Sequence, residues 1–176
     1  MKERPGESLL VVYTGEGKGK TTAALGLAIR ALGQGLRVGV MQFIKGKWQT
    51  GERRYFEALP DLEFRVMGRG FTWDSDDLSE DAKAARGAWE HCLAWMQAGD
   101  LDVVILDELT YGVNYGFLTI DEVVAGLKAR AAGVDVVVTG RNAPAPLVEL
   151  ADLVTDMQVV KHPFQAGHRA RIGVDY

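Results

Sequence analysis

The segment TGEGKGKTT, residues 14–22, stands between an apolar run at residues 9–12 and a helical pattern that begins at Ala23. Glycines let successive backbone amides curl into a concave nest, and a helix N-terminus adds partial positive charge, so together they bind phosphate oxygens. A strand, a glycine-rich loop and a helix in this order are typical of a nucleoside triphosphate site. We therefore predict a phosphate loop at residues 14–22, against the alternative of an ordinary strand-to-helix connection.

Individual residues of the phosphate loop have expected roles. Lys20 would reach the terminal phosphates as a point charge, and the Thr21 hydroxyl would ligate a magnesium ion that bridges two of them. The usual pattern is GxxxxGK(S/T), and Thr14 occupies the position of its first glycine. The expected ATP contacts along the loop, from backbone and side chains together, are Gly15, Glu16, Gly17, Lys18, Gly19, Lys20, Thr21 and Thr22.

Composition predicts one globular domain. The chain has 176 residues, of which 47% are apolar and 25% charged. Residues 1–8 form a short N-terminal segment and residues 161–176 a tail. A formal charge of -4 argues against nonspecific binding to nucleic acid, so we expect no nucleic-acid partner. The single cysteine, Cys92, argues against a disulfide framework. No segment resembles a signal peptide or a membrane span, so we expect a cytoplasmic protein with no membrane partner.

Short apolar runs alternate with helical patterns along the chain, and this order predicts an α/β fold. We expect the three-layer, RecA-like fold of P-loop NTPases, with a mainly parallel central sheet of about six strands. The expected strands are residues 9–13, 37–43, 101–106, 134–139 and 153–160, with 63–67 as the sixth. The expected helices span about 20–32, 79–96 and 120–131, and a short one follows Pro144 and Pro146. The aromatic stripe around Trp89 is interpreted as core.

A second chemical element is the run DVVILDE at residues 102–108, a buried strand that ends in two adjacent carboxylates. Ligands collect at the carboxyl ends of strands in an open parallel sheet, so Asp107 or Glu108 would lie beside Lys20 and Thr21. A carboxylate there can hold magnesium, directly or through water. The alternative is that Asp107 caps the next segment while Glu108 is solvated.

Three further loops follow predicted strands. Arg141 lies after the run at residues 134–138, where it could approach a phosphate, a ribose or a partner, or be a plain surface arginine. The segments QFIKGKW, residues 42–48, and MGRGFTW, residues 67–73, combine glycine, cations and large aromatics. Aromatics outside regular elements can wall a flat apolar ligand site, or they can anchor the core.

With these residues in view, the chain resembles the ATP:corrinoid adenosyltransferases of the cobalamin pathway, which act on cob(I)yrinic acid a,c-diamide and related corrinoids. The resemblance covers nearly the whole chain, and its motifs follow in order. They are TGEGKGKTTAALG at 14–26, GVMQFIKGKWQTGE at 39–52, GFTW at 70–73, VILDELTYGVNYG at 104–116, VVTGRNAP at 137–144 and KHPFQAGHRARIGVDY at 161–176.

The resemblance implies that a reduced Co(I) corrinoid attacks the 5′ carbon of ATP and expels triphosphate. The protein then has to position two ligands, stabilise charge on the leaving group and exclude water. Lys20 is among the implied catalytic residues. Thr21 with Glu108 would place magnesium against the triphosphate, and ATP would lie reversed in the loop. By position, Arg30 and Arg141 look like additional ATP contacts.

The same resemblance gives the GFTW aromatics a role. Phe71 and Trp73 look like catalytic residues that fill the lower axial face of cobalt, where they favour a four-coordinate Co(II) form that a reduced flavoprotein can convert to Co(I). The family commonly forms homodimers. Whether the corrinoid is a biosynthetic intermediate or salvaged cobalamin stays open.

The chain departs from the family pattern at Glu16, where many relatives carry Asn, and in its brief segment before Leu9, so another loop or a partner subunit would have to cover the corrin. The basic tail suits a corrinoid that carries carboxylates, or it is a solvated terminal segment. Three other functions remain open. They are a RecA-like ATPase in which Glu108 polarises water, a nucleotide-gated binding module, and a small-molecule kinase with Arg141 as a clamp.

Overall fold

The computed structural model describes residues 7–44, 50–66 and 78–175. Within this part of the chain, six strands form one sheet in the order β3-β2-β4-β5-β1-β6, and every pairing is parallel. The expected α/β fold with a central sheet of six strands is therefore confirmed. The strands are β1 Leu10–Thr14, β2 Val38–Gln42, β3 Leu62–Val66, β4 Val103–Asp107, β5 Asp135–Thr139 and β6 Leu153–Asp156.

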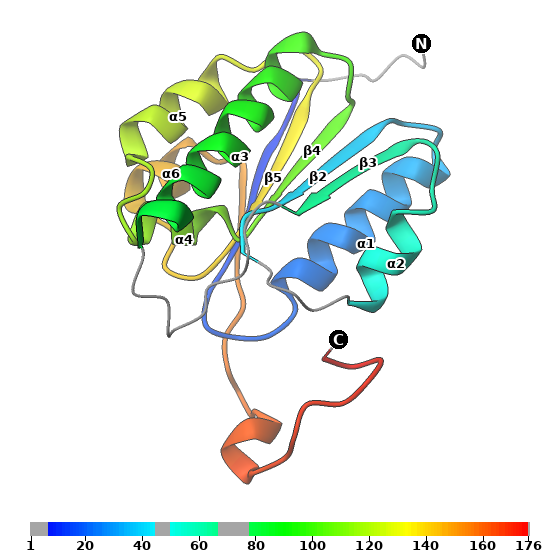
Figure 1. The fold of residues 1–176 in the computed structure, drawn as a ribbon, viewed down its shortest axis with the longest axis vertical. Coiled ribbons are helices and arrows are strands. Elements are labelled where there is room, and N and C mark those ends of the chain that lie inside the picture. Colours follow the sequence, from blue (N-terminus) through cyan, green and yellow to red (C-terminus); the bar gives the residue numbers. More distant parts are fainter. Residues whose placement is uncertain (1–6, 45–49, 67–77, 176) are drawn as a thin grey trace.

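Helices cover both faces of the sheet (Figure 1). One face carries α1 and α2, and the other carries α3, α4, α5 and α6, which gives the predicted three layers. The helices are α1 Lys20–Gly33, α2 Gly51–Phe56, α3 Leu78–Ala98, α4 Leu109–Asn114, α5 Ile120–Lys128 and α6 Ala145–Leu150, followed by the 3-10 helix η1 Pro163–Ala166.

Helix α1 packs through a stripe of small and branched apolar residues. Alanine and leucine dominate its sequence and favour helix. Its buried residues recur at helical spacing and face the middle of the sheet. Gly35, with φ of 73°, ends it, and the Gly35 amide donates to the Leu32 carbonyl at 2.8 Å. This packing fixes the N-terminal end of α1 at the carboxyl ends of the strands.

The opposite face holds the aromatic stripe of α3. Trp89, Cys92 and Met96 are buried against β4 and its neighbours, which confirms the interpretation of this stripe as core. The central strand β4 is buried along its whole length, as a strand covered on both faces should be. The rigid layer beneath the carboxyl ends of β1, β4 and β5 is therefore well packed.

Two features differ from the sequence expectation. Strand β6 ends at Asp156 rather than at residue 160, and all four of its residues are exposed. The helices α2 and α4 were not predicted, because six residues are too few for a 3.6-residue period to stand out. Thr50 begins α2 by accepting a hydrogen bond from the Arg53 amide at 3.4 Å.

Beyond β6 the chain runs past the end of the sheet, carries η1 and turns back toward the phosphate loop (Figure 1). No described helix is long and apolar enough to cross a bilayer. Of the two predicted ligand loops, residues 45–48 of the first (42–48) and the whole of the second (67–73), with Phe71 and Trp73, fall outside the described residues.

Candidate nucleotide-binding site

The phosphate loop joins β1 to α1 at the carboxyl edge of the sheet. Gly19 is the residue before α1 and has φ of 117°, while Gly15 has φ of 95°. Both values lie in a region that side chains other than glycine rarely adopt. The loop therefore delivers its backbone amides to the N-terminus of α1, as the sequence pattern predicts.

A second constraint on the loop comes from the chain after β6. The Gly17 amide donates to the Met157 carbonyl at 2.6 Å. A Cβ at Gly17 would lie 2.7 Å from that carbonyl oxygen and 2.8 Å from the Gln158 carbonyl oxygen. A Cβ at Gly15 would lie 2.1 Å from Asp156 Oδ1. A side chain at Gly15 or Gly17 would therefore clash with the end of β6 or the residues after it, even without a bound ligand.

Lys20 lies at the centre of the site. Its Nζ donates to the Gly15 carbonyl at 2.6 Å and to the Gly17 carbonyl at 2.7 Å. Burial lowers the pKa of the Lys20 ammonium, and the Arg141 guanidinium lowers it further. Three carboxylates act in the opposite direction, those of Glu16, Glu108 and Asp107. The Lys20 ammonium thus interacts with charges from three loops, so the structure brings Glu16, Asp107, Glu108 and Arg141 together around it.

Asp107 organises the site beneath Lys20. It is fully buried, and three side chains from different elements donate to its carboxylate. The Thr21 hydroxyl donates to Oδ1 at 2.9 Å, the Thr139 hydroxyl donates to Oδ1 at 2.7 Å, and the Gln42 amide donates to Oδ2 at 2.9 Å. Asp107 therefore ties β4 to α1, β5 and β2 at the point where the phosphate loop ends.

Glu108 follows Asp107 with φ of 62°, an unusual value for a residue with a side chain. Its amide donates to Thr139 Oγ1 at 2.9 Å, which links this conformation to the Asp107 network. The negative charge of Glu108 raises the pKa of Lys20, so its carboxylate lies within electrostatic reach of Lys20. The carboxylate that contacts Thr21 is nevertheless that of Asp107, and the predicted pairing of Thr21 with Glu108 at magnesium stays a prediction.

Arg141 is presented by a tight turn after β5. Gly140 has φ of 144°, and a Cβ there would lie 1.9 Å from Thr110 Oγ1. The Thr110 hydroxyl donates to the Arg141 carbonyl at 2.7 Å, which fixes the turn. Arg141 Nη1 lies 3.3 Å from Glu16 Oε2, and both side chains are about half exposed. Such a pair contributes little stability and opens readily.

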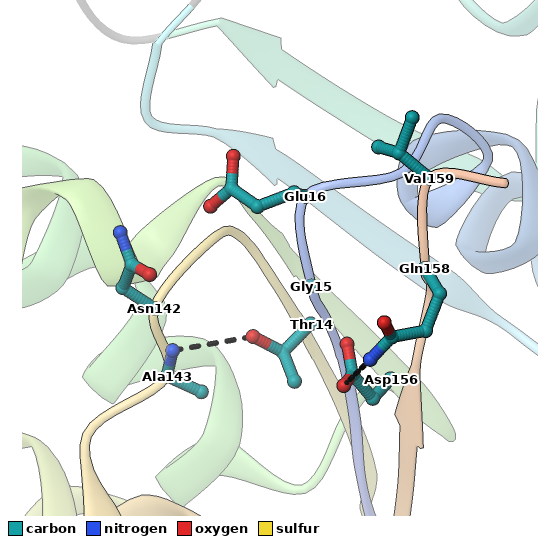
Figure 2. A pocket seen from close by; sticks show the side chains of 8 residues that line it. All are labelled: Thr14, Gly15, Glu16, Asn142, Ala143, Asp156, Gln158 and Val159. Carbon is teal, nitrogen blue, oxygen red and sulfur yellow. Dashed lines mark hydrogen bonds between the residues drawn. The ribbon is translucent and has the colours of Figure 1, made fainter. Parts of the chain in front are cut away.

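A cavity of about 350 Å³ lies between the phosphate loop, the turn after β5 and the end of β6. Figure 2 shows Glu16 and Asn142 on one side of it and Asp156 with Gln158 on the other. The Thr14 hydroxyl accepts a hydrogen bond from the Ala143 amide at 3.2 Å and so joins two of these walls. Thr14 thus has a structural role at the position where the usual pattern has glycine.

Other predicted contacts are dispersed. Arg30 lies in the last turn of α1, ten residues after Lys20, which is about 15 Å along the helix. The structure does not bring Arg30 to the phosphate loop. Thr22 is exposed at the start of α1. Lys18 forms an ion pair with Asp175 of the tail.

The oxygen donors at the site suit a hard cation. Thr21, Asp107 and Glu108 supply a hydroxyl and carboxylates, which are magnesium ligands, and Mg²⁺ is usually held by one or two carboxylates together with substrate phosphates. Among the described residues no group of three or more His, Cys, Asp or Glu forms a metal site. Any magnesium here would therefore depend on the phosphates for part of its coordination.

Comparison with known proteins gives this site its context. Residues 6–176 match the family described as ATP:corrinoid adenosyltransferase BtuR/CobO/CobP. The chain belongs to this family. The corrinoid adenosyltransferase of Escherichia coli K12 is 48% identical over 168 residues, which cover 96% of this chain and 85% of that protein. The corrinoid adenosyltransferase CobA of Salmonella typhimurium is 46% identical over the same shares of the two chains. That of Pseudomonas aeruginosa is 44% identical over 174 residues, 98% of this chain and 86% of that one.

Within this adenosyltransferase, several residues of the site were given no role by the sequence patterns. Gln42 begins the predicted ligand loop 42–48, but its bond to Asp107 was not predicted. Thr139 and Thr110 hold the acidic and basic loops, and Asp156 with Met157 borders the phosphate loop. Their common signal is position, since each lies within or directly after a strand, or in the first turn of a helix that follows one. Residue type alone would not have separated them from ordinary strand ends.

Proposed function

We propose that this enzyme transfers the 5′-deoxyadenosyl group of ATP to the cobalt of a reduced corrinoid. Family membership, together with a phosphate loop whose Lys20 and Thr21 lie beside Asp107, supports this function. The Co(I) electron pair forms the cobalt–carbon bond, the bond from C5′ to O5′ breaks, and its electron pair leaves with triphosphate. Cobalt is formally oxidised from Co(I) to Co(III), so no protein nucleophile is required.

The protein's own contribution is charge stabilisation and positioning. The Lys20 ammonium and the loop amides would hold the triphosphate, and negative charge grows there as it leaves. Among the described residues, the Arg141 guanidinium pairs with Glu16, and because both side chains are about half exposed, it can turn to the phosphates at little cost. The Asp107 network fixes the Thr21 hydroxyl and limits motion of the reacting groups.

Magnesium is the proposed cofactor. The ion would neutralise charge on the triphosphate when bound. Thr21 and Glu108 remain the proposed ligands, and the contact between Thr21 and Asp107 adds Asp107 as a residue that orients the hydroxyl. This arrangement keeps Asp107 in the network that joins β4 to β2 and β5, and it assigns the ion to Thr21 and Glu108.

The corrin would bind beside Phe71 and Trp73, which we propose as the aromatic groups on the lower axial face. This placement rests on the family resemblance of the GFTW motif. A reduced flavoprotein is the proposed electron donor that converts Co(II) to Co(I) on the enzyme. Biosynthetic intermediates and salvaged cobalamin share the corrin ring that these aromatics would face, so the proposal covers both substrate classes.

We further propose that the chain acts in the cytoplasm as a single-domain subunit of a homodimer. The exposed edge strand β6 and the apolar side chains beyond it support association, because parallel sheets are normally covered on both faces. Val160 is 97% exposed, Ile172 81% and Phe164 78%. Exposed apolar patches mark interaction surfaces, and we propose these three side chains as parts of one. Arg30 and the cover for the corrin are then candidates for sites shared between subunits.

The deciding experiment identifies the products. Under anaerobic conditions, ATP and chemically reduced cobalamin should yield a light-sensitive adenosylcorrinoid and triphosphate in equal amounts. A Lys20→Ala variant is the matched control and should lose most of the transfer. If the products were ADP and phosphate instead, a RecA-like ATPase would replace the proposal. Phosphate transfer to the substrate would indicate a kinase, and nucleotide binding without turnover would indicate a binding module.

A further inference from the structure

The side chain of Glu16 places a negative charge among the cations that would hold the triphosphate. Glu16 Oε2 lies 3.3 Å from Arg141 Nη1, and the negative charge of the same carboxylate raises the pKa of Lys20. Figure 2 shows the Glu16 side chain extending from the phosphate loop toward the turn after β5. A phosphate oxygen that approached Arg141 or Lys20 would therefore meet like charge.

The backbones that carry Glu16 and Arg141 are both tied to other segments. The Thr110 hydroxyl donates to the Arg141 carbonyl at 2.7 Å. Next to Glu16, the Gly17 amide donates to the Met157 carbonyl at 2.6 Å. The two side chains of the pair are about half exposed, and an exposed ion pair contributes little free energy. The Glu16–Arg141 pair can therefore open by side-chain rotation while both loops stay in place.

We propose that Glu16 is a specificity-determining residue that competes with the triphosphate group for Arg141 and thereby weakens binding of the triphosphate product. ATP has an adenosine part through which it can make further contacts, whereas free triphosphate binds through its phosphates alone. Competition at Arg141 therefore costs the product a larger share of its binding free energy. The inference rests on the proposed function, because it concerns the product that this function releases.

The charge of the product strengthens this competition after transfer. When the bond from C5′ to O5′ breaks, its electron pair stays on oxygen, so triphosphate carries one more negative charge than the same group in ATP. Repulsion by the Glu16 carboxylate grows in proportion to that charge. As triphosphate leaves, the Glu16–Arg141 pair re-forms. Glu16 therefore favours ATP over triphosphate at the same set of cations.

The test compares calorimetric Kd values of triphosphate and ATP at one fixed magnesium concentration. Glu16→Gln keeps the size of the side chain and removes its charge, so triphosphate should bind about 2- to 10-fold tighter and ATP should gain less. Glu16→Asp keeps the charge on a shorter side chain and should stay closer to the wild type. Asp61→Asn is the control, because it removes an exposed carboxylate directly before β3, at the opposite edge of the sheet, and should change neither Kd.

Further measurements separate competition for Arg141 from a general effect of charge. In an Arg141→Ala background the gain from Glu16→Gln should shrink, because the contested cation is absent. The gain should also shrink between about 0.1 M and 1 M salt, since the Debye length falls from about 10 Å to about 3 Å. In transfer assays, Glu16→Gln should lower the inhibition constant of triphosphate by the same factor as its Kd.

Three results would overturn the proposal. If Glu16→Gln binds triphosphate no tighter than the wild type, the carboxylate does not compete with it. If Glu16→Asp departs further from the wild type than Glu16→Gln does, side-chain shape decides and charge does not. If the gain is as large in the Arg141→Ala background, the contested cation is not Arg141. Absence of adenosyl transfer would refute the proposed function instead, and the calorimetric comparison would still test the competition, because it needs no corrinoid.

Discussion

Gly17→Ala tests how the phosphate loop is held by the chain after β6. Gly17 is not among the residues of positive φ, so alanine can adopt its backbone conformation without strain. The added Cβ would lie 2.7 Å from the Met157 carbonyl oxygen and 2.8 Å from that of Gln158. These are backbone atoms that cannot rotate aside. The variant therefore isolates one steric contact between two segments far apart in the sequence.

The expected cost follows from overpacking, which destabilises by about 1–3 kcal/mol. For a chain of this length, 1 kcal/mol shifts Tm by about 2–4 °C, so Gly17→Ala should lower Tm by about 2–12 °C. Displacement of the phosphate loop should also lower the affinity for ATP. At an ATP concentration of 100 times the wild-type Kd, binding stabilises by about 2.7 kcal/mol, and a tenfold weaker variant would gain only about 1.4 kcal/mol.

Gly26→Ala is the matched control. Gly26 lies inside α1 with nothing within 4 Å of an added Cβ, so the exchange should gain about 1 kcal/mol from helix propensity and raise Tm by about 2–4 °C. Both variants are measured by thermal unfolding with and without ATP. The reasoning is refuted if Gly17→Ala keeps the wild-type Tm and the wild-type ATP shift.

Two further predictions concern buried groups. Asp107→Ala leaves the buried Gln42 and Thr139 donors and the partly buried Thr21 hydroxyl without this acceptor, and it should lower the free energy of unfolding by about 3 kcal/mol or more. Asp107→Asn should cost less, because its oxygen still accepts from Thr21 and Thr139 while a rotated Gln42 amide pairs with its nitrogen. Equal losses of the two variants in urea unfolding would contradict this. Burial raises the pKa of the Cys92 thiol above its ordinary value. The folded state therefore keeps the thiol protonated, and its stability is complete below about pH 8.5 and falls at higher pH by up to about 1.4 kcal/mol per unit. Cys92→Ala should lack this part of the slope when the free energy of unfolding is followed from pH 7 to 10, and an unchanged slope would exclude the thiol as its source.

The sequence was most informative where one local pattern sufficed. Apolar runs predicted the strands, and the order of strand, glycine-rich loop and helix predicted the phosphate loop. Both depend on interactions within a few residues, so periodicity and turn chemistry carry the information. The end of β6 was placed too late, because Val159 and Val160 look like strand residues although the chain has already left the sheet.

Contacts between distant segments were beyond these patterns. Nothing near Asp107 indicates that its partners are Gln42, Thr21 and Thr139, since this set depends on the order of strands in the sheet. Likewise, the sequence explained Gly15 and Gly17 by phosphate binding alone. The end of β6 and the residues after it also leave no space for a side chain at either position. Arg30 shows the reverse case, because a residue assigned to the nucleotide by resemblance lies about 15 Å along α1 from Lys20.

The Asp107 network also has a consequence for the time course of folding. Its donors come from α1, β2 and β5, and β4 supplies the carboxylate, so the network forms only after segments separated by up to 86 residues have met. Such nonlocal contacts form late. A fluorescent ATP analogue that depends on Thr21 would therefore bind only molecules that have assembled all four elements. The fluorescence of the bound analogue would therefore report fully folded molecules and not compact intermediates.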